Sequence, residues 1–217
     1  MCGDSLREEQ PLFQEVDGGA NPTSPLQYRI RVIEAKAAKK FTQRWHYSHT
    51  CPAGTHRFGL FDKDTLIGAA VFGQVIGRSQ AAYWYSNAPD KLIELRRLCC
   101  IDATPKNTES RFIGYCLRWL KKNTDYEAVL SLADTNVGHI GKIYQATNFK
   151  LVGETVKDGH PRLMIDGVER HARDMYDKHG SSSTKLLKEI YGERIEFKPK
   201  KAKRVYLYTL LKAKEEG

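Results

Sequence analysis

Two side chains near the middle of the chain are of types that can take part in proton transfer. Asp134 follows the apolar run AVLSLA, so it lies at the end of a predicted strand, and Tyr144 comes ten residues later in a predicted helix. A carboxylate there can accept a proton from an amine nucleophile, and a tyrosine hydroxyl can protonate a leaving group. The alternatives are that Asp134 caps the next helix and that Tyr144 is a core aromatic. The pattern alone leaves both open.

The polar segment DATPKNTESR, which joins a predicted strand to the helix after it, is suited to an anion. It contains Lys106, Asn107, Ser110 and Arg111. The first turn of a helix has unpaired backbone N–H groups and a positive dipole end, and the two basic side chains reinforce that charge. These four residues are therefore candidates for holding an anionic donor. An ordinary solvated connection, with Ser110 as a helix cap, is the alternative.

A second group of candidates surrounds the sequence WHYSH, residues 45–49. His46 and His49 share a face if this segment is helical, and Cys51 and His56 follow, so we consider a metal site. The spacing matches no regular zinc pattern. Iron, which histidine and carboxylate ligands suit, is the metal we would expect if one is bound.

Positive side chains are concentrated at two further places. Arg96 and Arg97 are adjacent in a predicted strand, so we expect them on opposite faces, one toward a site and one toward solvent. Near the C-terminus, five cations fall within seven residues: Lys198, Lys200, Lys201, Lys203 and Arg204. This basic run is interleaved with aromatic residues and continues a predicted strand over 195–211. We therefore expect a surface that follows a phosphate backbone rather than a merely solvated run of charge.

The elements that must position these residues alternate between strand and helix. We expect strands at 28–35, 56–62, 66–73, 92–101, 128–134 and 150–156, and helices at 35–47, 112–122 and 138–149. The segment AAYWYS, 81–86, is expected as a short aromatic strand or loop. Beyond 156 we expect a hairpin at Asp166-Gly167 and two helices. This order predicts an α/β fold with a mixed sheet flanked by helices, which holds ligands at the carboxyl ends of its strands.

The same pass along the chain predicts three regions. Residues 1–26 have the composition of a flexible acidic tail, 27–156 form the core, and 157–217 form a basic extension packed on that core.

Composition excludes several classes of protein. Of the 217 residues 41% are hydrophobic, which suffices for a packed core, and the net charge of +9 favours a polyanionic partner. No apolar run approaches the roughly 20 residues of a membrane-spanning helix, and the start lacks the features of a secretory signal. The five cysteines include no CxxC pair, which argues against a disulfide framework and favours a reducing cytoplasm.

The segment HIGKIYQATNFKLVGE resembles the end of the catalytic core in GCN5-related N-acetyltransferases, and the resemblance runs from Tyr28 to Val156. It implies that the loop after the central strand cradles the pyrophosphate of an acyl-CoA and that Tyr144 protonates the departing thiolate. The glycine-rich loop of that superfamily is replaced here by ATPKNTESRFIG, with Gly114 as its single glycine. The donor, acetyl-CoA or another activated small molecule, therefore stays open.

Longer blocks resemble the Mom family of bacteriophage DNA-modification proteins. They are ELRRLCCIDATPKNTESRFIGYCLRWLKK, LADTNVGHIGKIYQATNF, the late KPKKAKRVYLY and the early WHYSH. Mom proteins are atypical members of the acetyltransferase superfamily that convert adenine in duplex DNA to its N6-carbamoylmethyl form and so protect phage DNA from restriction. The resemblance implies the same function here, with double-stranded DNA and a small-molecule group donor as partners, in the cytoplasm of the bacterial host.

The resemblance also implies roles for single residues. Asp134 would draw the proton from the attacking amine, and Tyr144 and Arg96 would stabilise charge on the donor or leaving group. His46, Tyr47 and His49 would form a pocket for a base turned out of the duplex. A carbamoylmethyl group contains a nitrogen that an acetyl group lacks, so acetyl transfer alone does not produce it.

Two other functions fit parts of the sequence. An acyl-CoA-dependent N-acetyltransferase acting on a protein or small amine fits the fold, but not the missing glycine-rich loop. A non-catalytic DNA-binding protein fits the charge, but not the grouping of Asp134, Tyr144 and Arg96. The sequence leaves open whether the chain acts as a symmetric dimer.

Overall fold

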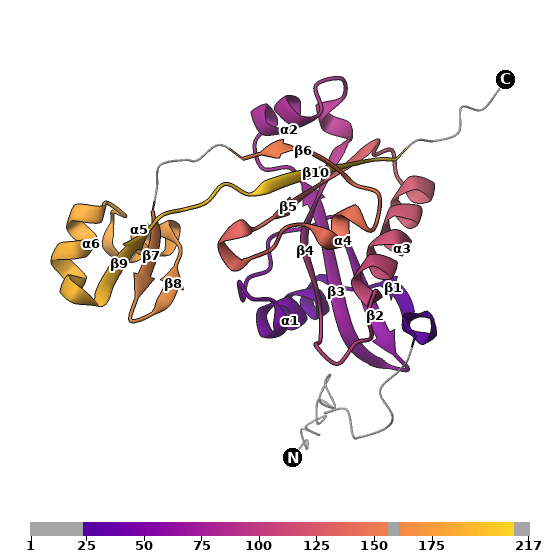
Figure 1. Ribbon diagram of the computed structural model, residues 1–217, viewed down its shortest axis with the longest axis horizontal. Helices are drawn as coiled ribbons and strands as arrows, with labels where there is room; N and C mark the ends of the chain where they lie inside the picture. The colour runs from indigo at the N-terminus through magenta and orange to yellow at the C-terminus, as the bar shows by residue number, and fades with distance from the viewer. Residues whose placement is uncertain (1–23, 156–160, 211–217) are drawn as a thin grey trace, which may run out of the picture. The chain divides into compact units, whose positions relative to one another are not determined.

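A seven-stranded mixed sheet forms the centre of the computed structural model, which describes residues 24–155 and 161–210 (Figure 1). Its strands lie in the order β1-β2-β3-β4-β5-β10-β6. They are β1 (Arg29–Val32), β2 (His56–Asp62), β3 (Thr65–Gln74), β4 (Leu92–Cys100), β5 (Ala128–Ala133), β6 (Lys150–Glu154) and β10 (Arg204–Thr209). Neighbours from β1 to β4 are antiparallel, whereas β4 and β5 are parallel. The predicted α/β fold with a mixed sheet is confirmed.

Helices α1 (Ala35–Trp45) and α3 (Thr108–Asn123) cover opposite faces of this sheet. The other helices are α2 (Arg78–Trp84), α4 (Lys142–Gln145), α5 (Ala172–His179) and α6 (Thr184–Tyr191), of which α5 and α6 pack on a second sheet, with short 3-10 turns η1 (Pro25–Gln27), η2 (Pro89–Lys91), η3 (Thr135–Val137) and η4 (Gly192–Arg194). Phe41 of α1 packs with Ala69, whereas Trp119 of α3 packs edge-on against Phe58, opposite Ala70. Since successive residues of a strand face opposite ways, α1 and α3 lie on opposite faces. Within the described residues no helix is long and apolar enough to cross a membrane.

Two irregularities mark β4, the central strand. Its ladder with β3 pairs Val71 with Arg97 and Phe72 with Leu95, so Arg96 is an extra residue in a β-bulge. On its other side, the parallel pairing with β5 ends at Leu95 and Ser131, although β4 continues to Cys100. The two central strands therefore part at their carboxyl ends, where a sheet of this class holds its ligands.

A second, three-stranded sheet has a core of its own. It consists of β7 (Arg162–Ile165), β8 (Val168–Arg170) and β9 (Ile195–Lys198), in the order β8-β7-β9, and its apolar face packs on α5 and α6 through Met175 and Leu187. The predicted hairpin at Asp166-Gly167 is confirmed, with both residues at positive φ, as a tight hairpin turn requires. Arg162 and Glu169 pair across this hairpin, with Nη2 and Oε2 2.6 Å apart.

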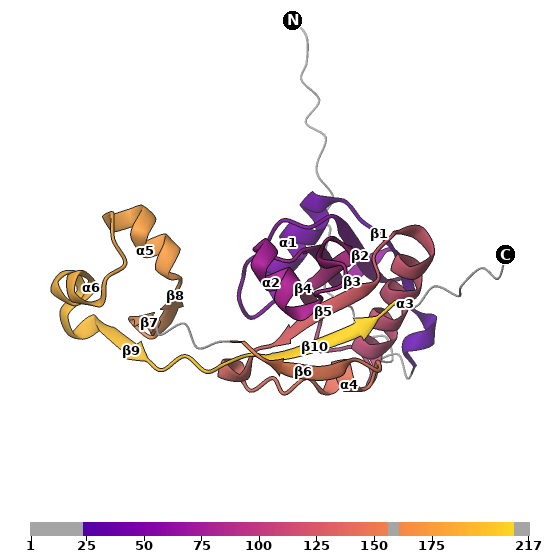
Figure 2. The same cartoon turned by 90° about the horizontal axis from the view of Figure 1, so that it is seen from above.

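The chain divides into two units that interleave along the sequence. The larger unit contains residues up to Leu132, then Gly141–Val152 and the segment from Val205 onward, and the smaller contains Ala133–Ile140 and Gly153–Arg204. This differs from the predicted division at 156/157, because β10 lies in the large sheet between β5 and β6 (Figure 2). The strand expected over 195–211 is two strands in two sheets, and the basic run joins them. Most of the predicted tail, residues 1–23, lies outside the described residues, and residues 25–27 form η1.

Two further elements differ from the sequence prediction. AAYWYS, expected as strand or loop, forms most of α2, where Ala81 is buried, because the β-propensity of aromatic residues is easily overridden by packing. The helix expected over 138–149 is reduced to the single turn α4, because Gly138 and Gly141 both adopt left-handed backbone conformations. The four described cysteines are free thiols, and burial raises the pKa of Cys99 to about 12.

Candidate active site

Polar side chains from four elements lie around the place in the larger unit where β4 and β5 stop pairing. We name them the polar cluster: Glu94 and Arg96 on β4, Ser131 on β5, Tyr144 on α4 and Tyr206 on β10. The rings of Tyr144 and Tyr206 have their centroids 5.3 Å apart. The Arg96 Nε lies 3.8 Å from Glu94 Oε2. The predicted residue Arg96 is thus paired with Glu94, whose charge also affects the pKa of the other predicted residue, Tyr144.

The phenol of Tyr144 is held in its protonated form. Burial raises its pKa; the Ser131 hydroxyl opposes this effect, and the charges of Glu94 and Tyr206 add to the increase. Phe149 supports the ring from the other side, with centroids 5.6 Å apart. A neutral phenol at the ends of the central strands can donate a proton or a hydrogen bond to a leaving group.

The polar cluster contains buried groups whose hydrogen-bonding capacity is not used. Ser131 is fully buried and its hydroxyl makes no hydrogen bond of regular geometry, although it lies close enough to Tyr144 to affect the pKa of that phenol. The Nε of Arg96 is likewise buried without a hydrogen bond. Buried polar groups in proteins are nearly always hydrogen-bonded, so these exceptions suit a ligand that supplies the partner.

Glu94 is the member of the polar cluster that the sequence prediction missed. Its side chain is 16% exposed, its Oε2 lies 3.8 Å from Arg96 Nε, and its charge raises the pKa of Tyr144. The available signal was an acidic residue within the apolar run of β4, two positions before Arg96. A carboxylate in such a strand is rarely buried without a partner or a purpose.

Both arginines of β4 bond the same loop. Arg96 Nη1 donates to the carbonyl of Ala53 at 2.6 Å and Nη2 donates to the carbonyl of Gln74, while Arg97 donates to the carbonyl and hydroxyl oxygens of Thr50 at 3.1 and 2.7 Å. The prediction of opposite faces is therefore wrong. The bulge at Arg96 interrupts the alternation of the strand, and it directs both guanidinium groups to the loop before β2.

The histidines of that loop are engaged separately. The chain leaves α1 at Trp45, so the segment is a turn rather than a helix, and His46 and His49 do not share a helical face. His46 is buried and its Nδ1 accepts from the backbone N–H of Ser48 at 3.1 Å, whereas His49 Nδ1 donates to the carbonyl of Gln43 at 3.0 Å. Tyr47 stacks on His46 with ring centroids 4.3 Å apart and is 47% exposed.

The residues considered for a metal do not come together. His56 packs against Trp119 and Tyr126, with ring centroids 5.4 and 5.9 Å away, and burial lowers its pKa. Across residues 24–155 and 161–210, no three His, Cys, Asp or Glu side chains are grouped so that they could hold a metal ion. The donor set expected for iron, with His46 and His49, therefore finds no support.

The predicted donor loop leads into α3 as expected, but with a different cap. Asn107 is the N-cap, in a left-handed conformation with φ 69°, and the Ser110 hydroxyl donates back to its carbonyl at 3.0 Å. The alternative of Ser110 as the helix cap is therefore wrong. Lys106 is exposed, while Nη1 of Arg111 is buried without a hydrogen bond and burial lowers the pKa of this guanidinium. A half-buried cation with one unused donor atom at a helix start fits an anionic group.

Asp134, the third predicted catalytic residue, belongs to the smaller unit. It caps η3: its Oδ1 accepts from the backbone and side-chain nitrogens of Asn136 at 3.0 and 2.9 Å, and its Oδ2 lies 3.2 Å from Lys203 Nζ. Burial raises its pKa, but the hydrogen bonds from Asn136 and the charge of Lys203 outweigh burial, so the pKa lies below its ordinary value. A carboxylate in this state is a weak base.

The basic run is partly neutralised by its own neighbours. Lys198 pairs with Glu196, with Nζ and Oε2 3.2 Å apart, and Lys203 pairs with Asp134. Lys201 is exposed. The basic run belongs to the smaller unit. The predicted donor loop and the loop with His46 and His49 belong to the larger unit.

Comparison with known proteins identifies relatives of two kinds. The family model of the Mom protein family matches residues 27–216 of this chain. The methylcarbamoylase Mom of Escherichia phage Mu is 27% identical over 147 residues, which cover 66% of this chain and 61% of that protein. The matched part of this chain thus spans about three fifths of the relative's length.

Solved structures of acetyltransferases share the fold. The ribosomal-protein-S18-alanine N-acetyltransferase of Escherichia coli superposes with a TM-score of 0.51 at 10% identity, covering 88% of this chain and 98% of that one. A spermidine/spermine N-acetyltransferase of Vibrio cholerae gives a TM-score of 0.51 at 10% identity, covering 86% and 94%. At this level of identity the likeness shows an acetyltransferase-like fold and no more.

Proposed function

The chain belongs to the Mom protein family, and on that premise we propose that it converts the exocyclic amine of adenine in double-stranded DNA to its N6-carbamoylmethyl form. The observation that carries the proposal is the polar cluster at the parting ends of β4 and β5, with its unused buried donors. A phage that carried this activity would protect its DNA from restriction in the cytoplasm of its host.

The larger unit supplies the groups for transfer from an activated donor. Arg111, with its buried and unused Nη1, and its neighbours Lys106, Asn107 and Ser110 would hold the anionic part of that donor. As the amine attacks, the bond to the leaving group breaks, and Tyr144 donates its proton to that group. Two kinds of donor would account for the product. A glycine-derived donor would already contain the carbamoyl nitrogen, whereas acetyl transfer from acetyl-CoA would have to be followed by a rearrangement with a nitrogen source.

The acceptor is a poor nucleophile, because the lone pair of the adenine amine is delocalised into the ring. Positioning must therefore contribute much of the rate. The amine is also paired inside the duplex, so the base has to be turned out. Tyr47, exposed and stacked on His46, is suited to receive it, and His49 lies on the same loop. Arg96 and Arg97 hold this loop against β4.

Asp134 and Glu94 are the two candidates for the base that removes the amine proton. Asp134 remains our sequence prediction for this role, but its carboxylate would first have to leave Lys203 and Asn136. Glu94 is the carboxylate of the larger unit whose charge raises the pKa of Tyr144. We expect variants of the two residues to distinguish them, since loss of the base lowers kcat at saturating DNA.

Nucleoside mass spectrometry on DNA from bacteria that express the chain tests the proposal. We expect a new deoxyadenosine species with the added mass of a carbamoylmethyl group, absent from a Tyr144→Phe control expressed at the same level. Unmodified DNA from folded protein would contradict the proposal. DNA-independent acetylation of a small amine or protein would favour the N-acetyltransferase alternative, and duplex binding without modification would favour a non-catalytic DNA-binding protein.

A further inference from the structure

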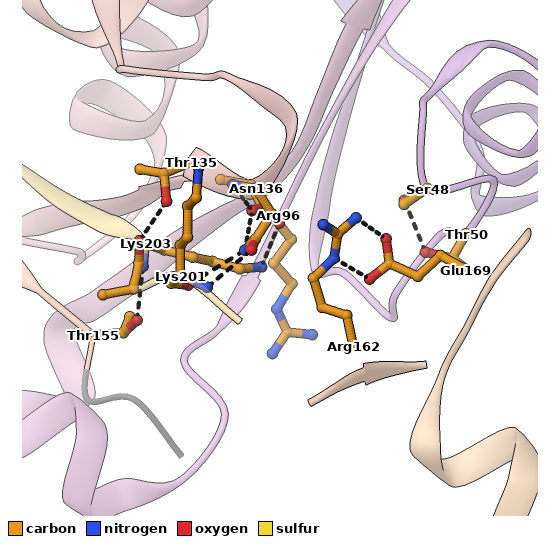
Figure 3. Close-up of polar contacts among 12 residues, drawn as sticks. Ser48, Thr50, Arg96, Thr135, Asn136, Thr155, Arg162, Glu169, Lys201 and Lys203 are labelled. Carbon is orange, nitrogen blue, oxygen red and sulfur yellow. Dashed lines mark hydrogen bonds and ion pairs between the residues drawn. The ribbon is translucent and has the colours of Figure 1, made fainter. Parts of the chain in front are cut away.

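Three consecutive side chains of the smaller unit bond three consecutive residues of the basic run. We name Asp134, Thr135 and Asn136 the bracket (Figure 3). The Thr135 hydroxyl donates to the carbonyl of Ala202 at 2.6 Å. Asn136 accepts from the backbone N–H of Lys201 at 2.9 Å and donates to its carbonyl at 3.3 Å. Asp134 pairs with the Lys203 ammonium at 3.2 Å.

Thr155 completes these contacts from the other side. Its hydroxyl accepts from the backbone N–H of Lys203 at 3.0 Å, and its own N–H donates to the carbonyl of Lys203 at 2.9 Å. The backbones of Lys201 and Lys203 are thus bonded at both their N–H and carbonyl groups, although this connection between β9 and β10 belongs to neither strand. The conformation of a segment outside regular structure is therefore specified by side chains.

These hydrogen bonds oppose two effects that would otherwise keep the basic run mobile. Five cations within seven residues repel one another, and ordering each backbone residue costs about 1–2 kcal/mol in entropy. Asp134 neutralises Lys203, the cation within the bonded segment, while Lys201 stays exposed and its ammonium takes part in none of these contacts. The bracket thus holds the backbone and leaves a cation available to a partner.

We propose that the bracket preorganises the basic run for the phosphates of duplex DNA, and that Asp134 acts there as a positioning residue. This inference rests on the proposed function, since it takes DNA as the partner. A run ordered before binding loses less entropy when it meets the phosphates, so its contribution to affinity is larger. Thr135 and Asn136 have no group that could act as a base at neutral pH, yet like Asp134 they bond the basic run.

A matched pair of variants in the full chain tests the inference. Thr135→Ser keeps the hydroxyl that bonds Ala202, and Thr135→Val removes it at nearly constant size. We expect Thr135→Val and Asp134→Asn each to weaken duplex binding about fivefold at low salt, and Thr135→Ser to bind as the wild type does. KM for DNA should rise in both weakened variants, while kcat at saturating DNA is retained in Thr135→Val.

A double-mutant cycle tests whether the bracket affects DNA binding by positioning Lys201. If the bracket acts by placing this cation, Thr135→Val should weaken binding less in a Lys201→Ala background than in the wild type. Thermal melting of each variant identifies any loss that reflects unfolding. Additive effects of the two changes would overturn the inference.

Two other outcomes are decisive in different ways. Equal affinity of Thr135→Val and Thr135→Ser for DNA would overturn the inference and leave the proposed function standing, as would a fall in kcat at saturating DNA with unchanged affinity in Asp134→Asn. A wild-type chain that binds no duplex at any salt concentration would overturn the proposed function, and the inference with it.

Discussion

The polar cluster and the bracket are both groups of polar side chains, but they differ in how far their hydrogen bonds are made. In the polar cluster Ser131 Oγ and Arg96 Nε are buried without a hydrogen bond of regular geometry, although Ser131 affects the pKa of Tyr144 and Arg96 Nε lies 3.8 Å from Glu94. In the bracket every side-chain oxygen and nitrogen of Asp134, Thr135 and Asn136 has a partner within the chain.

We infer from this difference that the polar cluster is a ligand site and that the bracket is a structural scaffold. Leaving a buried polar group unpaired costs about 1–3 kcal/mol, so a protein that retains such groups gains from them elsewhere, most simply in binding a ligand. A saturated group stabilises the structure around it and has little capacity left for chemistry. By this criterion Tyr144 lies in a reactive setting and Asp134 in a structural one, although the sequence predicted a proton-transfer role for both.

The largest expected effect concerns Tyr144. Replacing it with Phe removes the hydroxyl that would protonate the leaving group and retains the ring that packs on Phe149 and Tyr206. We expect DNA modification to fall by about 10²-fold or more, because general acid catalysis contributes on that scale. Nucleoside mass spectrometry gives the yield and thermal melting the stability. Full activity in Tyr144→Phe would show that the hydroxyl of Tyr144 takes no part in the reaction.

A glycine supports the polar cluster, and substituting it should destabilise the fold. A Cβ on Gly141 would lie 2.3–2.5 Å from the ring and hydroxyl of Tyr206, and the residue has φ of 81°. We expect Gly141→Ala to lower the free energy of unfolding by about 2–4 kcal/mol. Gly138→Ala is the matched control, because Gly138 has the same φ but nothing within 4 Å, so only backbone strain remains. Equal losses in denaturant titrations would mean that the contact with Tyr206 is unimportant.

The pairing of Asp134 should be visible in the pH dependence of stability. Because the folded protein lowers the pKa of this carboxyl, its contribution is fully present above the ordinary carboxyl pKa of about 4. The contribution is lost as the pH falls further, through the lowered pKa. We therefore expect the Tm difference between wild type and Asp134→Asn to shrink on acidification below about pH 4. A difference that grows on acidification would contradict the assignment of Asp134 to the scaffold.

The smallest expected effect compares two hydroxyl deletions. Ser131→Ala removes a buried hydroxyl without a regular hydrogen bond, so we expect stability to change by less than about 0.5 kcal/mol, or to rise. Thr135→Val removes a hydroxyl that bonds Ala202, and should lower stability by about 1 kcal/mol. Chemical denaturation measures both. A larger loss of stability in Ser131→Ala than in Thr135→Val would show that hydrogen-bond satisfaction does not distinguish the polar cluster from the bracket.

Most of the sheet follows from periodicity. β2, β3 and β4 lie within two residues of their predicted bounds, because their apolar residues face helices on both sides. The same reasoning failed at α2, where aromatic residues favoured a strand, and at α4, where glycines shortened a predicted helix. Local pattern identifies buried segments better than it assigns short exposed ones.

The candidate site was predictable only in part. The family resemblance brought Arg96 and Tyr144 to attention, and the structure places both in the polar cluster. A bulge leaves no trace in the residue pattern, so the shared direction of Arg96 and Arg97 was missed. The bracket was missed for another reason: Asn136 and Lys201 are 65 positions apart, and hydrogen bonds over that separation have no periodic signature.

The position of β10 has a consequence for how the chain comes to be folded. This strand is the last of the described elements, yet it lies between β5 and β6, and most of the smaller unit separates it from β6 along the sequence. During synthesis, β5 and β6 must therefore wait for a segment made about fifty residues after β6, and until it arrives both present unpaired edges. Cooperative closure of the sheet is then the last step of folding, and a chain interrupted before Arg204 is exposed to aggregation through those edges.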